Sequence, residues 1–220
     1  MCYDRAEVKA YYEFQIAKGE WDNFGGRTNL DHVCSLAQIP DVNSGRVLDI
    51  GCGDGDVAQA LSGRGIAWSQ YLGVDAIPAL VDQFNSRKLD GARAIVDEVT
   101  DLTQLAANSV DLVLCLFLLQ DICRTEGESV VETVVRVLTP AGHAIWSLAV
   151  TSQTSFSSRG GAQALKAIGS PDKGRFTWGE SDFLDTLRTR GLIEQARRED
   201  PSATHATLSE LYLLTKRSLR

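Results

Sequence analysis

The sequence predicts an α/β fold organised around a mostly parallel β-sheet, and three observations lead to this prediction. Short apolar runs alternate with helical patterns from residue 47 to about residue 196, which is typical of a parallel sheet covered by helices on both faces. A glycine loop joins the first apolar run to the helix that follows it. The strongest apolar run, residues 109–119, has the composition of a central strand that is buried on both faces.

The alternation also places the individual elements. Residues 4–18 have an amphipathic helical pattern, and a second helix begins near residue 29 and stops at Pro40. Seven strands are expected, at residues 47–50, 71–75, 92–97, 109–119, 143–148, 192–196 and about 208–215. Further helices are expected from residue 56, from residues 76–78, after residue 127 and behind a capping box at residues 177–180.

The glycine loop after the first strand is the strongest functional signal. Gly51, Gly53 and Gly55 allow a sharp turn and a close approach to a ligand, and the helix that begins next directs free N–H groups toward that ligand. Two acids, Asp49 and Asp56, flank the loop and would repel a pyrophosphate. We therefore expect a nucleotide-like ligand that carries positive charge.

The pattern Asp49-x-Gly51-x-Gly53-x-Gly55, followed by a second strand that ends in Asp75, resembles motif I of the class I S-adenosylmethionine (SAM)-dependent methyltransferases of the small-molecule type. The resemblance implies a Rossmann-like, seven-stranded, mostly parallel sheet with a C-terminal antiparallel hairpin and helices on both faces. It also implies that SAM is the cofactor.

The resemblance further implies how the chain is divided. Residues 1–44 are expected to form an N-terminal helical cap of the same domain, and residues 45–220 the SAM-binding methyltransferase domain. Residues 151–175 begin with a stretch dominated by serine and threonine, and they follow the carboxyl end of the fifth strand. Two interpretations of this segment stay open, a lid over the site and a surface insertion.

Contacts to SAM are expected along the carboxyl ends of the first four strands. The spacing of Asp75 from the loop favours hydrogen bonds to the ribose hydroxyls. The resemblance assigns Asp97, with Glu98, to the adenine, although a turn cap is an alternative for Asp97. It also assigns backbone carbonyls at the end of the fourth strand to the methionine ammonium. The expected cofactor-binding set is Tyr11, Arg27, Asp49, Gly51, Cys52, Gly53, Asp75, Ala76, Asp97, Glu98, Cys115 and Leu116.

Some of these expectations have a structural alternative. Tyr11 or Tyr12 on the first helix is as suited to packing on the sheet as to lining a substrate pocket. Arg27 beside the double glycine suits the methionine carboxylate, or else is a solvated surface residue.

Methyl transfer from a sulfonium is a direct displacement that depends mainly on alignment, and a base is needed only when the acceptor holds its proton firmly. The base candidates are Asp121, His205 and His32. Each alone is also explained by a structural role, because no spacing ties it to a partner. Related small-molecule enzymes often have histidine at the position of Asp121, so this chain departs from them there.

Composition narrows the classes of partner. The chain has 220 residues, a net charge of −7 and a pI of about 5.0, which does not favour nucleic acid. No apolar run is long enough to span a bilayer and no secretory signal is visible, so we expect a cytoplasmic protein. The five cysteines and three histidines lack the spacing of a metal site. The sequence does not indicate an oligomeric state.

The leading hypothesis is a SAM-dependent methyltransferase that acts on an O, N, S or C nucleophile of a small molecule, as in specialised metabolism. One alternative keeps the fold and directs it at protein or RNA. Another is a SAM-binding protein of this fold that does not methylate. An NAD-dependent dehydrogenase is disfavoured by the acids Asp49 and Asp56.

Overall fold

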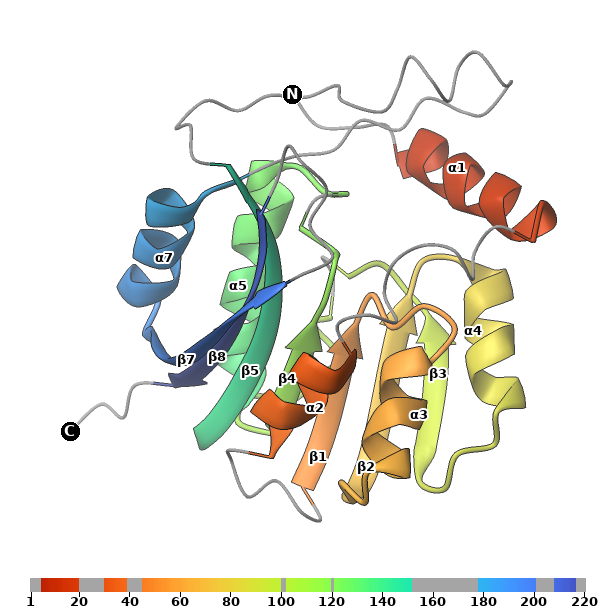
Figure 1. Cartoon of the computed structure of the whole chain (residues 1–220), viewed down its shortest axis with the longest axis horizontal. Helices are drawn as coiled ribbons and strands as arrows, with labels where there is room; N and C mark the ends of the chain where they lie inside the picture. Colours follow the sequence, from red (N-terminus) through yellow and green to blue (C-terminus); the bar gives the residue numbers. More distant parts are fainter. Residues whose placement is uncertain are drawn as a thin grey trace.

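The structure, a computed structural model, describes residues 5–19, 30–38, 45–99, 102–119, 121–151, 178–200 and 208–216. In these residues a single twisted sheet runs through the molecule and carries helices on both faces (Figure 1). The arrangement confirms the predicted fold class.

The sheet has seven strands in a continuous path, in the order β3-β2-β1-β4-β5-β8-β7. The strands β1 to β5 run parallel, and β8 is antiparallel to both β5 and β7. This is the predicted parallel sheet with a C-terminal antiparallel hairpin. Their bounds are β1 Gly45–Ile50, β2 Trp68–Asp75, β3 Ala92–Val96, β4 Val110–Cys115, β5 Leu138–Thr151, β7 Leu192–Asp200 and β8 Leu208–Lys216.

The helices divide between the two faces of the sheet. Apolar side chains of α2, α3 and α4 pack on one face, and those of α5 and α7 pack on the other. Helix α1 lies across the edge at which the parallel strands end (Figure 1). Their bounds are α1 Arg5–Ala17, α2 Leu30–Ala37, α3 Asp56–Gly63, α4 Pro78–Ser86, α5 Arg124–Val137 and α7 Glu180–Thr189. None of the helices in the described ranges is long and apolar enough to cross a membrane.

Strand β4 is the centre of the core, as its composition predicts. Val113 and Cys115 face the cluster beneath α5 and α7, whereas Leu112 and Leu114 face the cluster beneath α2 and α3. All four side chains are fully buried. Because helices cover both faces, an uninterrupted apolar strand is stable here and alternation is not needed.

Several boundaries differ from the prediction, and the differences at β4, β5 and α7 are described here. Strand β4 ends at Cys115 rather than at residue 119, because Phe117 adopts a left-handed φ of 56° and its N–H bonds to the Ser147 hydroxyl at 2.5 Å. Strand β5 begins earlier, at Leu138, with a register shift opposite Val110.

Helix α7 begins at Glu180 and not at the predicted capping box. Trp178–Gly179 form a short strand, β6, that pairs in parallel with the end of β5, so these residues are extended rather than helical. Thr177, the predicted cap, lies outside the described residues. A capping box does occur at the start of α5, between Cys123 and Glu126.

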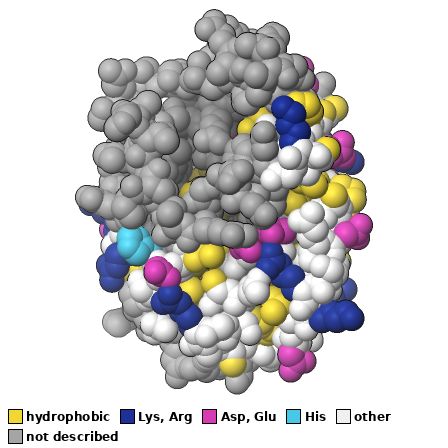
Figure 2. Space-filling model, turned by 45° about the vertical axis from the view of Figure 1, so that its right-hand side comes forward, with side chains coloured by type: hydrophobic (Ala, Val, Ile, Leu, Met, Phe, Trp, Pro, Cys, Tyr) yellow, Lys and Arg dark blue, Asp and Glu magenta, His cyan; other side chains and the backbone are white. Residues whose placement is uncertain are grey.

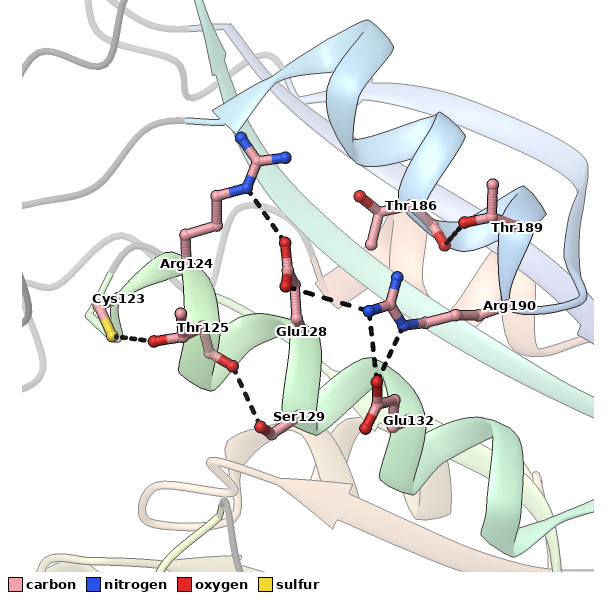
Figure 3. Close-up of polar contacts among 9 residues, drawn as sticks. All are labelled: Cys123, Arg124, Thr125, Glu128, Ser129, Glu132, Thr186, Thr189 and Arg190. Atoms are coloured by element: carbon pink, nitrogen blue, oxygen red, sulfur yellow. Dashed lines mark hydrogen bonds and ion pairs between the residues drawn. The ribbon is translucent and has the colours of Figure 1, made fainter.

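An ion-pair network joins α5 to the end of α7 (Figure 3). Arg190, just after α7, reaches Glu132 at 3.3 Å and Glu128 at 4.0 Å on α5. Glu128 also pairs with Arg124 at 3.1 Å on its own helix. The two helices that cover this face of the sheet are therefore linked by charge as well as by apolar packing.

Candidate functional site

The candidate site lies where β1, β2 and β4 end, which in an open α/β sheet is the ligand-binding edge. The loop after β1 turns back on β2, because the N–H groups of Gly51 and Cys52 both donate to the carbonyl of Val74, at 2.8 and 3.1 Å. The loop is thereby attached to the strand that carries Asp75.

The three loop glycines all have positive φ values, of 77°, 54° and 88° for Gly51, Gly53 and Gly55. Gly55 is required for packing as well, since a Cβ there would approach Phe84 Cδ2 to 2.6 Å. This confirms the predicted role of glycine in the turn. It also shows that part of the requirement comes from α4, which packs directly against the loop.

Asp75 has both carboxylate oxygens held by backbone N–H groups. Oδ2 accepts a hydrogen bond from Gly53 and Oδ1 accepts one from Ile77, each at 2.9 Å. The residue is 9% exposed. Burial raises the pKa of Asp75 and the nearby Asp121 carboxylate raises it further, whereas the backbone hydrogen bonds act in the opposite direction. The structure therefore presents an oriented carboxylate beside the glycine loop.

Asp49, at the other side of the loop, is 1% exposed and accepts a hydrogen bond of 2.5 Å from the Tyr71 hydroxyl. Burial raises its pKa to about 7; the Tyr71 bond opposes this rise and the Asp75 charge adds to it. Asp49 therefore carries only part of a negative charge near neutral pH. Its role as a ligand for a cationic cofactor stays a proposal.

Asp56 has a counter-charge within the protein, which corrects the prediction that this acid favours a cationic ligand. Its carboxylate oxygen lies 2.7 Å from Nη2 of Arg87, and Asp54 lies 2.6 Å from the same nitrogen. The protein itself thus supplies the positive charge that the sequence interpretation assigned to the ligand. Arg87 stands 31 and 33 residues away from the two acids, and no spacing in the sequence signals the contact.

At the end of β3, the two residues expected at the adenine have protein partners. Asp97 accepts hydrogen bonds from the backbone N–H of Glu98 at 2.8 Å and from the side-chain amide of Gln104 at 2.7 Å. The first of these agrees with the turn-cap alternative for Asp97. Glu98 pairs with Arg5 of α1 at 3.1 Å.

At the end of β4, Cys115 and Leu116 are 0% and 7% exposed. The chain then turns over the glycine loop, since Leu118 lies 3.5 Å from the position of a Cβ on Gly51. Asp121 follows, with its N–H bonded to the carbonyl of Leu118 at 2.9 Å. These contacts bring Asp121 to the site.

Tyr12 of helix α1 contacts Asp121. The hydroxyl of Tyr12 donates a hydrogen bond to Asp121 Oδ2, and Asp121 is 8% exposed. Tyr11, the tyrosine in the expected cofactor set, is buried and meets the ring of Tyr12 edge-on at 5.4 Å. The structure therefore links Tyr12 to a candidate site residue, whereas the contact of Tyr11 with SAM stays a prediction. Sequence reasoning missed this pair because its members are 109 residues apart.

Helix α1 is also held at this edge by charge. Arg5 donates to Glu126 at the start of α5, at 3.1 and 3.0 Å, besides its pair with Glu98. The described part of the expected N-terminal cap thus contacts the segments that follow both β3 and β4.

The remaining candidates are not brought to the site by any described contact. His32 lies on α2. The adjacent Asp31 pairs with Arg64, which follows the carboxyl end of α3, and this end of the helix is remote from the loop. Arg27, His205 and residues 152–175 of the expected lid lie outside the described residues. Over the described ranges, no group of three or more His, Cys, Asp or Glu side chains is placed to hold a metal ion.

Comparison with known protein families agrees with the order of strands and helices described above. Residues 48–146 match the methyltransferase domain family, a segment that runs from β1 to β5 and contains the glycine loop, Asp75 and Asp121. The match, with the strand order, shows that the chain has the class I methyltransferase fold.

Curated and solved proteins are similar to the chain at low identity. The ubiquinone biosynthesis O-methyltransferase of Xanthomonas campestris pv. campestris is 28% identical over 116 residues, which are 51% of this chain and 45% of that protein. The chain thus matches about half the length of its curated relatives.

Solved structures with the same fold include the following two. The 1,6-didemethyltoxoflavin-N1-methyltransferase of Burkholderia thailandensis, solved with 1,6-didemethyltoxoflavin and S-adenosylhomocysteine (SAH), is 13% identical, with a TM-score of 0.75 over 97% of this chain and 88% of that one. The (4+2)-cyclase SpnF is 16% identical, with a TM-score of 0.67 over 86% of this chain and 82% of that one.

Proposed function

We propose that the chain is a SAM-dependent methyltransferase that transfers a methyl group to a nucleophilic O, N, S or C atom of a small molecule. The observation that carries the proposal is the carboxylate of Asp75, held by two backbone N–H groups beside the glycine loop. An acid in this position accepts hydrogen bonds from ribose hydroxyls. The match of residues 48–146 to the methyltransferase domain family supports the same conclusion.

The residues at this edge fit SAM. The N–H groups of Gly51 and Cys52 donate to the carbonyl of Val74 and the N–H of Gly53 donates to Asp75, so the backbone of these three residues forms a tight turn beside Asp75. Asp75 would hold the ribose. The other residues proposed to contact SAM are Asp49, Ala76, Asp97, Glu98, Cys115 and Leu116, together with Tyr11 and Arg27.

The cofactor supplies an activated methyl group when it is bound, and the protein aligns the acceptor and removes its proton where one must be lost. Among the base candidates, contacts in the structure favour Asp121. It lies close enough to the cofactor site to raise the pKa of Asp75, and the hydroxyl of Tyr12 orients its carboxylate. We propose that Asp121 takes the acceptor proton; His205 and His32 remain secondary candidates.

A small acceptor is favoured by the charge of the molecule and by its relatives. The net charge is −7, and acidic and basic side chains are interspersed over the described surface in Figure 2. This pattern of charge does not indicate a broad basic surface that would bind RNA. The similar Burkholderia enzyme binds 1,6-didemethyltoxoflavin, and the curated relative is named an O-methyltransferase.

The binding test compares Asp75→Asn with Asp82→Asn, which removes an exposed carboxylate on α4. Titration calorimetry with SAM should give a dissociation constant for Asp75→Asn that is roughly 10- to 100-fold higher than for the wild type, because a charge-assisted hydrogen bond to the ribose contributes about 1.5–3 kcal/mol. Asp82→Asn should bind like the wild type. Equal affinity of both variants would show that Asp75 does not bind the ribose.

The same series tests the base. Asp121→Asn should bind SAM within about threefold of the wild type, since an amide can still accept from Tyr12. Its production of SAH with a panel of small phenols, amines and thiols should be much slower. If the wild type binds SAM and releases no SAH with any acceptor, the chain is better described as a SAM-binding protein that does not methylate, a class consistent with the shared fold of the cyclase.

A further inference from the structure

Arg87, at the end of α4, contacts the glycine loop and the start of α3 through every guanidinium nitrogen. Nε donates to the carbonyl of Asp54 at 2.5 Å, and Nη1 donates to the side-chain carbonyl of Gln59. Nη2 donates to the carboxylates of Asp54 at 2.6 Å and Asp56 at 2.7 Å. The Arg87 side chain thus contacts residues within the segment 54–59, which precedes it by about thirty positions in the sequence.

These contacts act on the last peptide of the loop, just before α3 begins. The Asp54 carbonyl belongs to the peptide that enters Gly55, whose φ is 88°, and the N–H of Gly55 bonds to the carbonyl of Cys52 at 3.2 Å. Arg87 therefore holds the last peptide of the loop in the conformation from which α3 begins. A planar guanidinium can hold several acceptors in a fixed arrangement, which an ammonium cannot do.

Arg87 also neutralises charge. Asp54 is 8% exposed and Arg87 has a side-chain exposure of 22%, so this pair is largely removed from water. Removal of Arg87 alone would leave the Asp54 carboxylate buried without its counter-charge, and such a variant is expected to be strongly destabilised. A loss of binding in that variant would not distinguish positioning from unfolding.

We propose that Arg87 is a positioning residue for the cofactor: it holds residues 54–56 of the glycine loop in the binding conformation before the ligand arrives. This inference rests on the proposed function, because it takes SAM as the ligand of the loop. Arg87 itself does not touch the ligand in this proposal. Its effect is exerted by preorganisation, which strengthens binding by removing the cost of ordering the loop.

The test uses a pair of variants that share one change. Asp54→Asn keeps the Arg87 contacts to the Asp54 carbonyl, Asp56 and Gln59. The double variant Asp54→Asn/Arg87→Met removes one positive and one negative charge, so its net charge equals that of the wild type and no buried carboxylate is left unpaired at residue 54. The dissociation constant of SAM, the thermal midpoint and the amide exchange of Gly55 and Gln59 are measured for both variants.

We expect the double variant to bind SAM about tenfold more weakly than Asp54→Asn, with similar thermal midpoints of the two variants. Exchange at the Gly55 and Gln59 amides should be faster in the double variant without ligand. Equal SAM affinity of the two variants, with both folded, would overturn the inference.

If the double variant does not fold, Arg87→Lys replaces it, because lysine keeps the charge and loses the planar array of donors. Wild-type affinity in Arg87→Lys would likewise overturn the inference.

The outcomes separate this inference from the proposed function. Should the wild type fail to bind SAM, the proposed function fails, and the inference about SAM affinity fails with it. Should the wild type bind SAM and the variants bind equally well, only the role of Arg87 is wrong. The exchange measurement reports on the loop without any ligand, so it shows in either case whether Arg87 orders residues 54–59.

Discussion

Two carboxylates lie against the glycine loop at the ends of β1 and β2, and burial raises the pKa of each. They differ in their partners. Asp75 accepts hydrogen bonds from backbone N–H groups, which favour its charged form, whereas Asp49 has the Tyr71 hydroxyl and is 1% exposed. The environment of each side chain thus gives Asp75 the features of a ligand-binding acid and gives Asp49 those of an acid that titrates near neutrality.

The raised pKa of Asp49 predicts a dependence of stability on pH. The folded-state pKa of about 7 lies above the unfolded value, which is about 3.9, so the folded state binds more protons between these values. The resulting stabilisation is complete below pH about 3.9 and is lost as the pH rises to about 7. In Asp49→Asn the side chain does not titrate in this pH range, and its amide oxygen can still accept a hydrogen bond from the Tyr71 hydroxyl.

Urea unfolding of the wild type and Asp49→Asn at pH 5 and pH 8 measures this effect. Between these two pH values the free energy of unfolding of the wild type should fall more than that of Asp49→Asn, by on the order of 1–4 kcal/mol. Asp75 contributes in the same direction in both proteins, so the difference between them reports the titration of Asp49 together with its coupling to Asp75. Parallel pH profiles would show that Asp49 is ionised in the folded protein at pH 5.

At the scale of elements, the helices on the α5 and α7 face offer a matched test of a long-range ion pair. Arg190 pairs with Glu128 and Glu132 across the two helices and is 29% exposed (Figure 3). Arg188 pairs with Asp185, three residues earlier on α7, and is 62% exposed. Methionine at either position keeps an apolar stem and removes the charge.

Arg190→Met should lower the free energy of unfolding by about 0.5–1 kcal/mol, because a partly buried arginine with two partners loses more than an exposed one. Arg188→Met should cost at most about 0.3 kcal/mol. Chemical denaturation at moderate salt measures both changes. An equal effect of the two substitutions would mean that the contact between α5 and α7 depends on apolar packing alone.

The elements themselves could largely be predicted because their signals are local. Strand β1, the three glycines and the start of α3 follow from adjacent residues, and Pro78 begins α4 as expected. The end of β4 could not be predicted, because Phe117 leaves the strand to bond with Ser147, a residue thirty positions away. The two-residue strand β6 likewise depends on β5 and has no pattern of its own.

For the whole molecule, the site follows from the sheet. The strand order brings the ends of β1, β2 and β4 together, so the position of Asp75 beside the glycine loop could be predicted from spacing. Side-chain pairs that join distant segments, such as Arg87 with Asp56 and Tyr12 with Asp121, could not be assigned, since the sequence gives no relation between them. The partner of Asp56 could not be foreseen for this reason, although the predicted fold was confirmed.

The central claim, that this edge of the sheet binds SAM, is tested most directly by calorimetric titration of the wild-type protein with SAM and, separately, with NAD. We expect saturable binding of one SAM per chain and no detectable binding of NAD under the same conditions. Binding of NAD without binding of SAM would contradict it.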